Sequence, residues 1–233
     1  MSIFDKLLGW VFVPKCPFCG GLLQKEDRDG MCSVCRGTLP YTSGRGAETH
    51  GNFFDECVSP LYYQEGVRRA ITRYKFRSMR GTGGYHRCFS GLMVPCIREH
   101  YHRKFDFVTW VPVSKKRKRD RGYDQAELLA RDVGEMLGIP VLCTLEKSRN
   151  NAANSGIRQE ERRRANVSGV YKTANGAIIK DKAVLVIDDV ITTGATLSEC
   201  ARTLLMGGAG LVFGATVAKT GKSGAGRHNG GTT

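Results

Sequence analysis

The chain has 233 residues, and its 36 lysines and arginines outnumber 22 aspartates and glutamates to give a formal net charge of +14. Hydrophobic residues make up 41% of the sequence, which is enough to bury a core and excludes wholesale disorder. The absence of any run of about 18 apolar residues excludes a transmembrane helix. A chain this basic is expected to bind polyanions, namely nucleic acid, anionic lipid or phosphorylated small molecules.

The excess positive charge lies in the middle of the chain. Residues 58–104 contain ten basic and two acidic side chains, and residues 105–182 contain 16 basic and ten acidic ones. By contrast, residues 1–57 have six basic and seven acidic side chains, and residues 183–233 have four and three. The charge is therefore not that of a basic tail.

The N-terminal segment lacks the basic region and the cleavage site of a signal peptide. Its apolar stretch at residues 7–13 is interpreted as a short helix that packs Leu7, Leu8 and Trp10 against the protein. Nine cysteines in a chain of this length favour a reducing environment over a secreted disulfide framework. We therefore expect a cytoplasmic protein.

Two CxxC pairs, separated by twelve residues, supply Cys16 and Cys19, then Cys32 and Cys35. Each pair can hold two thiolates on one turn, and two such turns complete a tetrahedral zinc site. The alternatives are free buried cysteines or a redox pair, but a redox motif occurs once and follows a strand. Four thiolates leave no open coordination position, so the zinc is expected to be structural.

After Cys57 the hydrophobic pattern predicts strands that alternate with helices. The expected strands cover residues 58–63, 107–111, 141–145, 183–187 and 211–217, and the expected helices cover residues 67–79, about 90–103, 123–137 and 197–206. This alternation predicts an α/β domain with a mainly parallel sheet, which binds ligands beyond the carboxyl ends of its strands. We predict three parts: a cysteine-rich module at 1–57, the α/β domain at 58–219, and a disordered Gly-rich tail at 220–233.

The segment VLVIDDVITTGAT at residues 184–196 contains the most informative motif. A strand delivers Asp188 and Asp189 near its carboxyl end, and the next turn offers hydroxyls and backbone N–H groups at a helix N-terminus. Carboxylates accept hydrogen bonds from sugar hydroxyls, and such a turn binds phosphate, so the pair suits a ribose 5-phosphate. The alternative is an acidic pair that only caps a strand–loop junction.

This segment resembles the phosphoribosyl pyrophosphate (PRPP) signature of type I phosphoribosyltransferases. Together with WVPVS at 110–114, RGYDQAELLA at 121–130 and RRRANV at 162–167, it is similar to the ComF family of competence-associated, amidophosphoribosyltransferase-like proteins. That family also has an N-terminal zinc ribbon. The resemblance implies a type I phosphoribosyltransferase-like fold, with a mainly parallel sheet flanked by helices and a small N-terminal zinc ribbon.

The resemblance also implies roles for individual residues. Asp188 and Asp189 would hold the ribose hydroxyls, directly or through Mg²⁺. The 5-phosphate would be bound by Thr192, Thr193, Gly194, Ala195 and Thr196. The turn at 112–114 corresponds to the pyrophosphate-binding loop, and residues 115–121 would be a mobile loop over the pyrophosphate. The residues expected to act there are Val113, Ser114, Lys115, Arg119 and Arg121.

The chain departs from the family pattern at three places. Asp124 stands where an asparagine is typical, and Asn-Ala-Ala-Asn at residues 151–154 replaces Thr-x-x-Gln. Of a second cysteine set that many members have in the region of residues 40–57, only Cys57 is present. These departures bear on the contacts to an acceptor substrate rather than on the PRPP site.

A basic stretch follows Gly66, with aromatic residues between the charges. Its candidate nucleic-acid contacts are Arg69, Arg73, Lys75, Arg77 and Arg80. Cations for a phosphate backbone and aromatic faces for bases are typical of single-strand binding. The alternative is a solvated helix face, and we expect Tyr74 and Phe76 to point to the core. Residues 115–121 could likewise bind pyrophosphate or nucleic acid, or form a solvated loop.

Two functions remain open from the sequence. One is a Mg²⁺-dependent phosphoribosyltransferase that acts on an unknown nitrogen acceptor. The other is a non-enzymatic adaptor that binds PRPP and single-stranded DNA during DNA uptake, together with a competence helicase and recombination proteins, as the family resemblance implies. Both predict that the chain binds PRPP.

Overall fold

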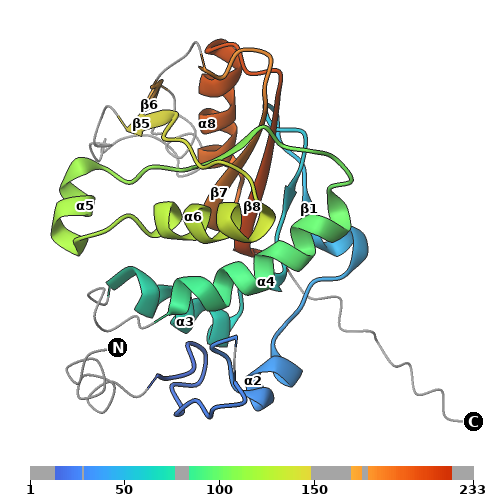
Figure 1. Ribbon diagram of the computed structural model, residues 1–233, viewed down its shortest axis with the longest axis vertical. Coiled ribbons are helices and arrows are strands. Elements are labelled where there is room, and N and C mark those ends of the chain that lie inside the picture. Colours follow the sequence, from blue (N-terminus) through green and yellow to red (C-terminus); the bar gives the residue numbers. More distant parts are fainter. Residues whose placement is uncertain (1–13, 28, 77–83, 148–168, 175–177, 222–233) are drawn as a thin grey trace, which may run out of the picture.

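The structure is a computed structural model that describes residues 14–27, 29–76, 84–147, 169–174 and 178–221. A central sheet is covered by helices on both faces, and a cysteine-rich segment lies beyond one helical layer (Figure 1). The expected helix at residues 7–13, the segments at 151–154 and 162–167, Arg77, Arg80 and most of the tail lie outside these ranges.

The main sheet consists of β1 (Glu48–Thr49), β2 (Cys57–Val58), β3 (Leu61–Tyr62), β4 (Phe107–Trp110), β7 (Ala183–Ile191) and β8 (Leu211–Lys219). Their order is β1-β2-β8-β7-β4, with β3 beside β2 along the same edge of β8. Only the β1–β2 pair is antiparallel. The central strands β7 and β8 are apolar and mostly buried, as expected for strands covered on both faces.

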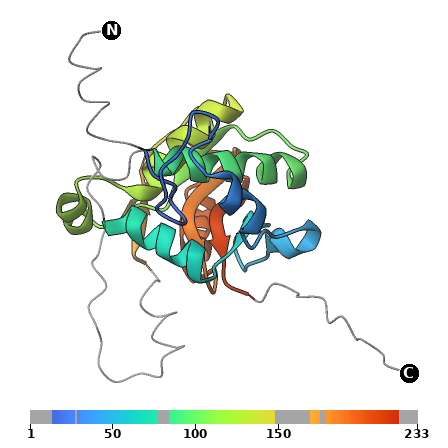
Figure 2. The ribbon, with the colours of Figure 1, turned by 90° about the horizontal axis from the view of Figure 1, so that it is seen from below.

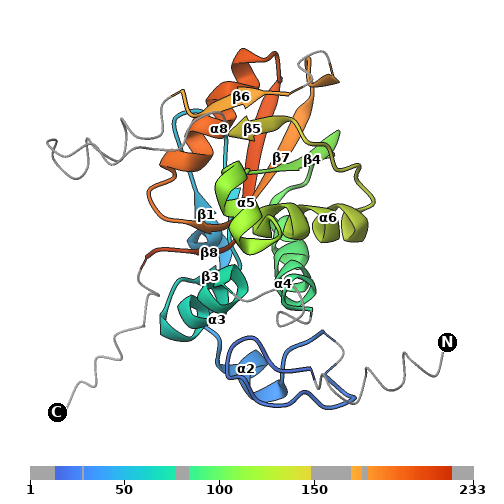
Figure 3. The same ribbon diagram turned by 90° about the vertical axis from the view of Figure 1, so that its left-hand side faces the viewer.

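Two hydrophobic cores lie on the two faces of this sheet. On one face, Leu185 and Ile187 of β7 pack with α3 (Glu65–Phe76), α4 (Tyr85–His100) and α6 (Gln125–Leu137). On the other face, Val184 and Val186 pack with α8 (Ala195–Met206) and with the small sheet of β5 (Leu145–Lys147) and β6 (Tyr171–Thr173). Figure 3 shows these two layers on opposite sides of the sheet. The α/β fold with a mainly parallel sheet is therefore confirmed.

The first core extends into the knuckle, by which we mean residues 14–39 with the short helix α2 (Ser33–Thr38). Phe18 and Met31 are almost fully buried and belong to the same cluster as Tyr74 and Phe89. From below, the knuckle lies across α3 and α4 (Figure 2). The main sheet includes residues 48–49 and 57–58. It therefore extends across the domain boundary that was predicted after residue 57.

Several element boundaries were wrong. The strand expected at 58–63 is split by Ser59 and Pro60 into β2 and β3, because proline has no N–H to donate. The strand expected at 141–145 is a single bridge from Val141 to Val108, and β5 begins at Leu145 in a separate antiparallel pair. Helix α4 begins five residues before the predicted start.

Residues 115–121 form a helix, α5 (Lys115–Arg121), instead of the expected loop. The hydroxyl of Ser114 accepts a hydrogen bond from the Arg117 N–H, which caps the helix, and Gly122 ends it in a left-handed conformation with φ of 81°. Lysine and arginine have high helix propensity, but α5 buries no residue. Without an apolar face, its sequence gives no periodic signal.

Within the ranges that the structure describes, no helix has the length and the apolar character needed to cross a membrane.

Candidate functional site

The acid pair, Asp188 and Asp189, lies on β7, which continues for two residues beyond the pair. The strand was expected to end at residue 187; instead, Asp188 and Val190 still pair in parallel with β8. The Asp189 N–H donates to Asp188 Oδ1 at 2.8 Å, and Lys75 Nζ lies 2.8 Å from Asp189 Oδ1. Lys75 reaches the pair from the last turn of α3.

The two carboxyl groups differ in their electrostatic environment. Burial, and next the charge of Asp189, raise the pKa of Asp188 to about 8. Asp188 can therefore keep its proton at neutral pH, while Asp189 is paired with the ammonium group of Lys75. The pair retains oxygens that can accept hydrogen bonds from sugar hydroxyls.

The turn after β7 forms a small hollow at the N-terminus of α8. Gly194 precedes the helix with φ of 72°, a left-handed conformation that favours glycine. The hollow has a volume of about 30 Å³, and among its lining residues are Asp188, Thr192, Gly194, Ala195 and Thr196. Thr193 does not line it, but its hydroxyl accepts a hydrogen bond from the Ala195 N–H at 3.5 Å. Backbone N–H groups and hydroxyls at a helix N-terminus suit a phosphate group.

A larger cavity, which we call the main cavity, adjoins this turn and has a volume of about 250 Å³. It is lined by Lys75, Val111, Pro112, Val113, Arg117, Arg121, Gln125, Ala126, Lys147, Tyr171, Asp188, Asp189 and Thr196. The cavity thus connects the acid pair with the turn at 112–114. Four cationic side chains line it against two carboxyl groups, so its potential favours an anionic ligand.

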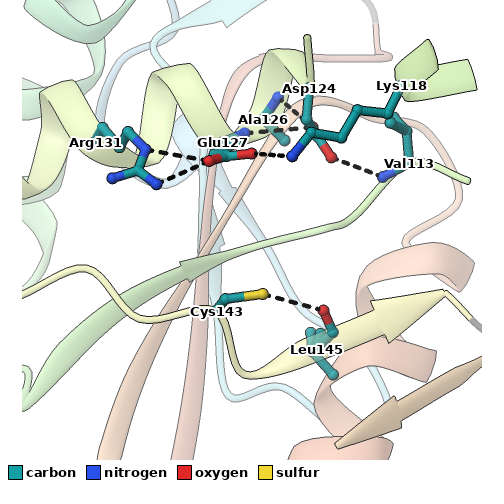
Figure 4. A network of polar contacts seen from close by, with 8 residues as sticks. All are labelled: Val113, Lys118, Asp124, Ala126, Glu127, Arg131, Cys143 and Leu145. Atoms are coloured by element: carbon teal, nitrogen blue, oxygen red, sulfur yellow. Dashed lines mark hydrogen bonds and ion pairs between the residues drawn. The ribbon is translucent and has the colours of Figure 1, made fainter. Parts of the chain in front are cut away.

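Asp124 holds the turn at 112–114 in place. Its Oδ2 accepts the Val113 N–H at 2.9 Å, and its Oδ1 accepts the N–H groups of Ala126 and Glu127 at the start of α6 (Figure 4). Burial raises the pKa of Asp124, although these three N–H groups act in the opposite direction. An asparagine has only one carbonyl oxygen, so the carboxylate at this position supplies an additional acceptor.

Helix α5 is connected to α6 by charged contacts. Lys118 Nζ lies 2.8 Å from Glu127 Oε2, and Arg131 of α6 binds the other oxygen of Glu127 (Figure 4). Burial opposes ionisation, but these two cations lower the pKa of Glu127 below its ordinary value. Arg121 Nη1 donates to Gln125 Oε1 at 2.6 Å.

The predicted pyrophosphate-loop residues therefore take different positions. Val113 and Arg121 line the main cavity, and Ser114 caps α5. Lys115 and Arg119 are exposed, and neither lines the cavity. Arg117, which the sequence did not single out, is also exposed, but it lines the main cavity.

Of the five residues predicted to contact nucleic acid, the three within the described ranges lie in three different surroundings. Arg69 is exposed and pairs with Glu65 on its own helix. Arg73 donates to the backbone of the knuckle, and Lys75 points to the acid pair. Of the interleaved aromatics, Tyr74 is buried as expected, but Phe76 is 73% exposed, with the Arg121 guanidinium 5.2 Å from its ring centre.

Lys147 and Tyr171 were also missed by sequence reasoning. They lie on β5 and β6, strands of three residues each, and the Lys147 ammonium is 5.3 Å from the centre of the Tyr171 ring. Burial, and next the positive charge of Arg117, lower the pKa of Lys147. Strands this short have no measurable periodicity, so their sequences could not indicate these residues.

The four predicted zinc ligands lie together in the knuckle. The Sγ atoms of Cys16, Cys19, Cys32 and Cys35 are all within 4.8 Å of one another, and those of Cys19 and Cys32 are 3.7 Å apart. Tetrahedral bonds of about 2.3 Å to zinc require sulfur–sulfur distances of roughly 3.8 Å, so this set fits the metal. Backbone N–H groups of Gly21 and Cys35 donate to the sulfurs of Cys19 and Cys32, respectively.

The chain is similar to several known proteins. A family model described as phosphoribosyl transferase domain matches residues 120–229. Competence protein F of Haemophilus influenzae is 28% identical over 214 residues, covering 82% of this chain and 90% of that protein. Competence protein ComFC of Bacillus subtilis is 29% identical over 197 residues, covering 82% and 71%. Among solved structures, the allosteric regulatory enzyme of purine biosynthesis is 22% identical with a TM-score of 0.42, covering 61% of this chain and 29% of that longer one.

Proposed function

Since the chain belongs to the ComF family of competence-associated proteins and has a type I phosphoribosyltransferase-like fold, we propose that it binds PRPP in the main cavity. The observation that carries this proposal is the composition of the cavity. Two adjacent carboxyl groups and the N-terminal residue Thr196 of α8 line it together with four cations, Lys75, Arg117, Arg121 and Lys147.

Each part of PRPP corresponds to one part of this site. The ribose hydroxyls would bind the acid pair, and the 5-phosphate would occupy the small hollow formed by the turn at 192–196. The pyrophosphate would lie among the cations beside Val113. Mg²⁺, bound with the ligand, would add positive charge at the pyrophosphate and at the acid pair. Because the free acid pair already has Lys75 as a partner, we expect the metal to arrive with PRPP.

Arg117 and Arg121 could stabilise the departing pyrophosphate if the C1–O bond of PRPP breaks. Fixed positive charge next to a leaving group that gains negative charge lowers the barrier of such a step. A transferase would then release pyrophosphate only when a nitrogen acceptor is present. We propose this activity for the main cavity, with the acceptor as the open part of the reaction.

Calorimetric titration tests PRPP binding. In the presence of Mg²⁺, PRPP should bind saturably, whereas pyrophosphate and ribose 5-phosphate should each bind at least about tenfold more weakly, because each meets only part of the site. A pyrophosphate-release assay across candidate nitrogen acceptors then tests transfer. Equal affinity for PRPP and pyrophosphate would contradict the assignment of the acid pair to the ribose.

The outer face of α5 favours a second candidate function, an adaptor that binds single-stranded DNA. Lys115, Lys116 and Arg119 are exposed and share one side of this helix, and within the described chain they form no ion pair. Three free cations next to a site for a phosphorylated sugar suit a phosphate backbone.

The adaptor function predicts salt-dependent binding of single-stranded oligonucleotides. Changing Lys115, Lys116 and Arg119 together to glutamine should reduce the slope of log affinity against log salt by about 2, since each phosphate contact contributes about 0.7. Fluorescence anisotropy at several salt concentrations measures this slope. A matched triple change at exposed positions outside α5, Lys25, Lys104 and Lys180 to glutamine, is the control. An unchanged slope in the α5 variant would exclude this face as the DNA contact.

A further inference from the structure

Three consecutive residues in the last turn of α3, which we call the α3 turn, contact three separate parts of the protein. Arg73 donates to the knuckle, Tyr74 donates from its hydroxyl to Gln125 O at 2.8 Å, and Lys75 reaches Asp189. The hydroxyl of Tyr123 in turn donates to the backbone oxygen of Tyr74. One turn of helix therefore lies between the cysteine cluster and the acid pair.

The contact with the knuckle is made at the first CxxC turn. Arg73 Nη1 donates to the carbonyl oxygen of Pro17 at 3.2 Å, between Cys16 and Cys19. The next residue, Phe18, is buried and packs edge-on against Phe89 at 5.8 Å, and Phe89 packs against Tyr74 at 5.5 Å. A hydrogen bond and a chain of rings thus join the metal-binding turn to the α3 turn.

The contact with the acid pair leaves Lys75 able to bind a ligand. Its Nζ lies 2.8 Å from Asp189 Oδ1, and its side chain lines the main cavity. A lysine ammonium has three N–H donors, and Asp189 takes one of them. Lys75 can therefore keep its bond to Asp189 and donate to an anionic group in the cavity.

We propose that Lys75 binds the pyrophosphate of PRPP and that the knuckle, through Arg73, holds Lys75 in position to do so. This inference rests on the proposed PRPP site. It gives the four-cysteine cluster a role beyond stability, because loss of the knuckle contact lowers PRPP affinity through one identified side chain. Arg73 is a positioning residue here, and Lys75 is the residue that contacts the ligand.

The physical reason is the small size of the knuckle. Its regular structure is a six-residue helix and a single bridge between Lys15 and Leu22, so a metal crosslink is needed to fix the position of Pro17. A hydrogen bond to Pro17 therefore restricts the segment that carries Lys75.

A double-mutant cycle on the full chain, with PRPP and Mg²⁺ in the calorimeter, tests the proposal. Lys75→Met should weaken PRPP binding about tenfold or more, since a hydrogen bond from a charged group is lost. Lys75→Arg should recover much of this loss. Arg73→Met keeps all four cysteines and should weaken binding about threefold or more, but should cause no further loss when Lys75 is already methionine.

Arg68→Gln, an exposed change on the same helix, is the control and should bind as the wild type does. Zinc content and circular dichroism of each variant show whether the knuckle and the fold are retained. Unchanged affinity in Lys75→Met, or equal effects of Arg73→Met with and without Lys75, would overturn the inference. If the wild type itself does not bind PRPP, the proposed function fails and the inference fails with it.

Discussion

Asp188 is a half-buried carboxyl group whose position suits ligand binding better than stability. Burial and the neighbouring Asp189 raise its pKa from the ordinary value of 3.8 to about 8. At pH values between these two pKa values, Asp188 is protonated in the folded protein but ionised in the unfolded chain. The free energy of unfolding therefore decreases as the pH rises between those two values. Functional sites often carry such a cost in stability.

Asp188→Asn should remove this pH dependence. The amide stays neutral at every pH, so at pH 8 the variant should be more stable than the wild type by several kcal/mol, since each unit by which the pKa is raised corresponds to about 1.4 kcal/mol. Near pH 4 the two proteins should differ little, since both carry a neutral group there. Thermal unfolding at a series of pH values measures this, with Asp120→Asn, an exposed change on α5, as the control. Parallel curves for the wild type and Asp188→Asn would show that the pKa of Asp188 is not raised.

Among the elements, α5 depends most on its contacts at the ends and with α6. It buries no side chain, and its first turn contains Lys115 and Lys116, whose charges are unfavourable at a helix N-terminus. The Ser114 cap, the Lys118–Glu127 pair and the bond from Arg121 to Gln125 hold it in place. Because Arg117 and Arg121 line the main cavity, an anionic ligand should stabilise this helix.

Hydrogen exchange should therefore detect PRPP at α5. In the wild type, exchange of the backbone amides of residues 115–121 should slow when PRPP and Mg²⁺ are added. Ser114→Ala should make exchange without ligand about fivefold faster, since the loss of an N-cap costs about 1 kcal/mol, whereas Ser114→Thr should not. Identical exchange at 115–121 with and without bound PRPP would show that α5 takes no part in the site.

At the scale of the whole molecule, the knuckle shares its core with the α/β domain. Phe18 and Met31 belong to the same cluster as Tyr74 and Phe89, so loss of the metal should destabilise both parts together. Purified protein should contain about one zinc per chain, and a chelator should lower the midpoint of a single unfolding transition by about 10 °C or more. Well under one zinc per chain, or an α/β domain that unfolds at the same temperature with and without the chelator, would contradict this.

The sequence allowed the acid pair, the turn at 192–196 and the four cysteines to be predicted because each is a contiguous or regularly spaced motif. It could not place Lys75 and Lys147 in the main cavity, since they come from α3 and β5, which tertiary packing brings together. The helix at 115–121 was missed because it has no apolar face, and β6 because three residues show no period. Local sequence patterns do not reveal the residues that complete a site from elements distant in the sequence.

Calorimetric titration of PRPP with Mg²⁺ into the wild type and into the Asp188→Asn/Asp189→Asn double variant tests the ribose assignment most directly. The amides remove the charge and the strongest acceptors at the acid pair but keep the side-chain volume. The wild type should bind saturably, and the double variant should lose at least about tenfold in affinity while remaining folded. An unchanged isotherm in the double variant would contradict the assignment of the acid pair as the ribose-binding site.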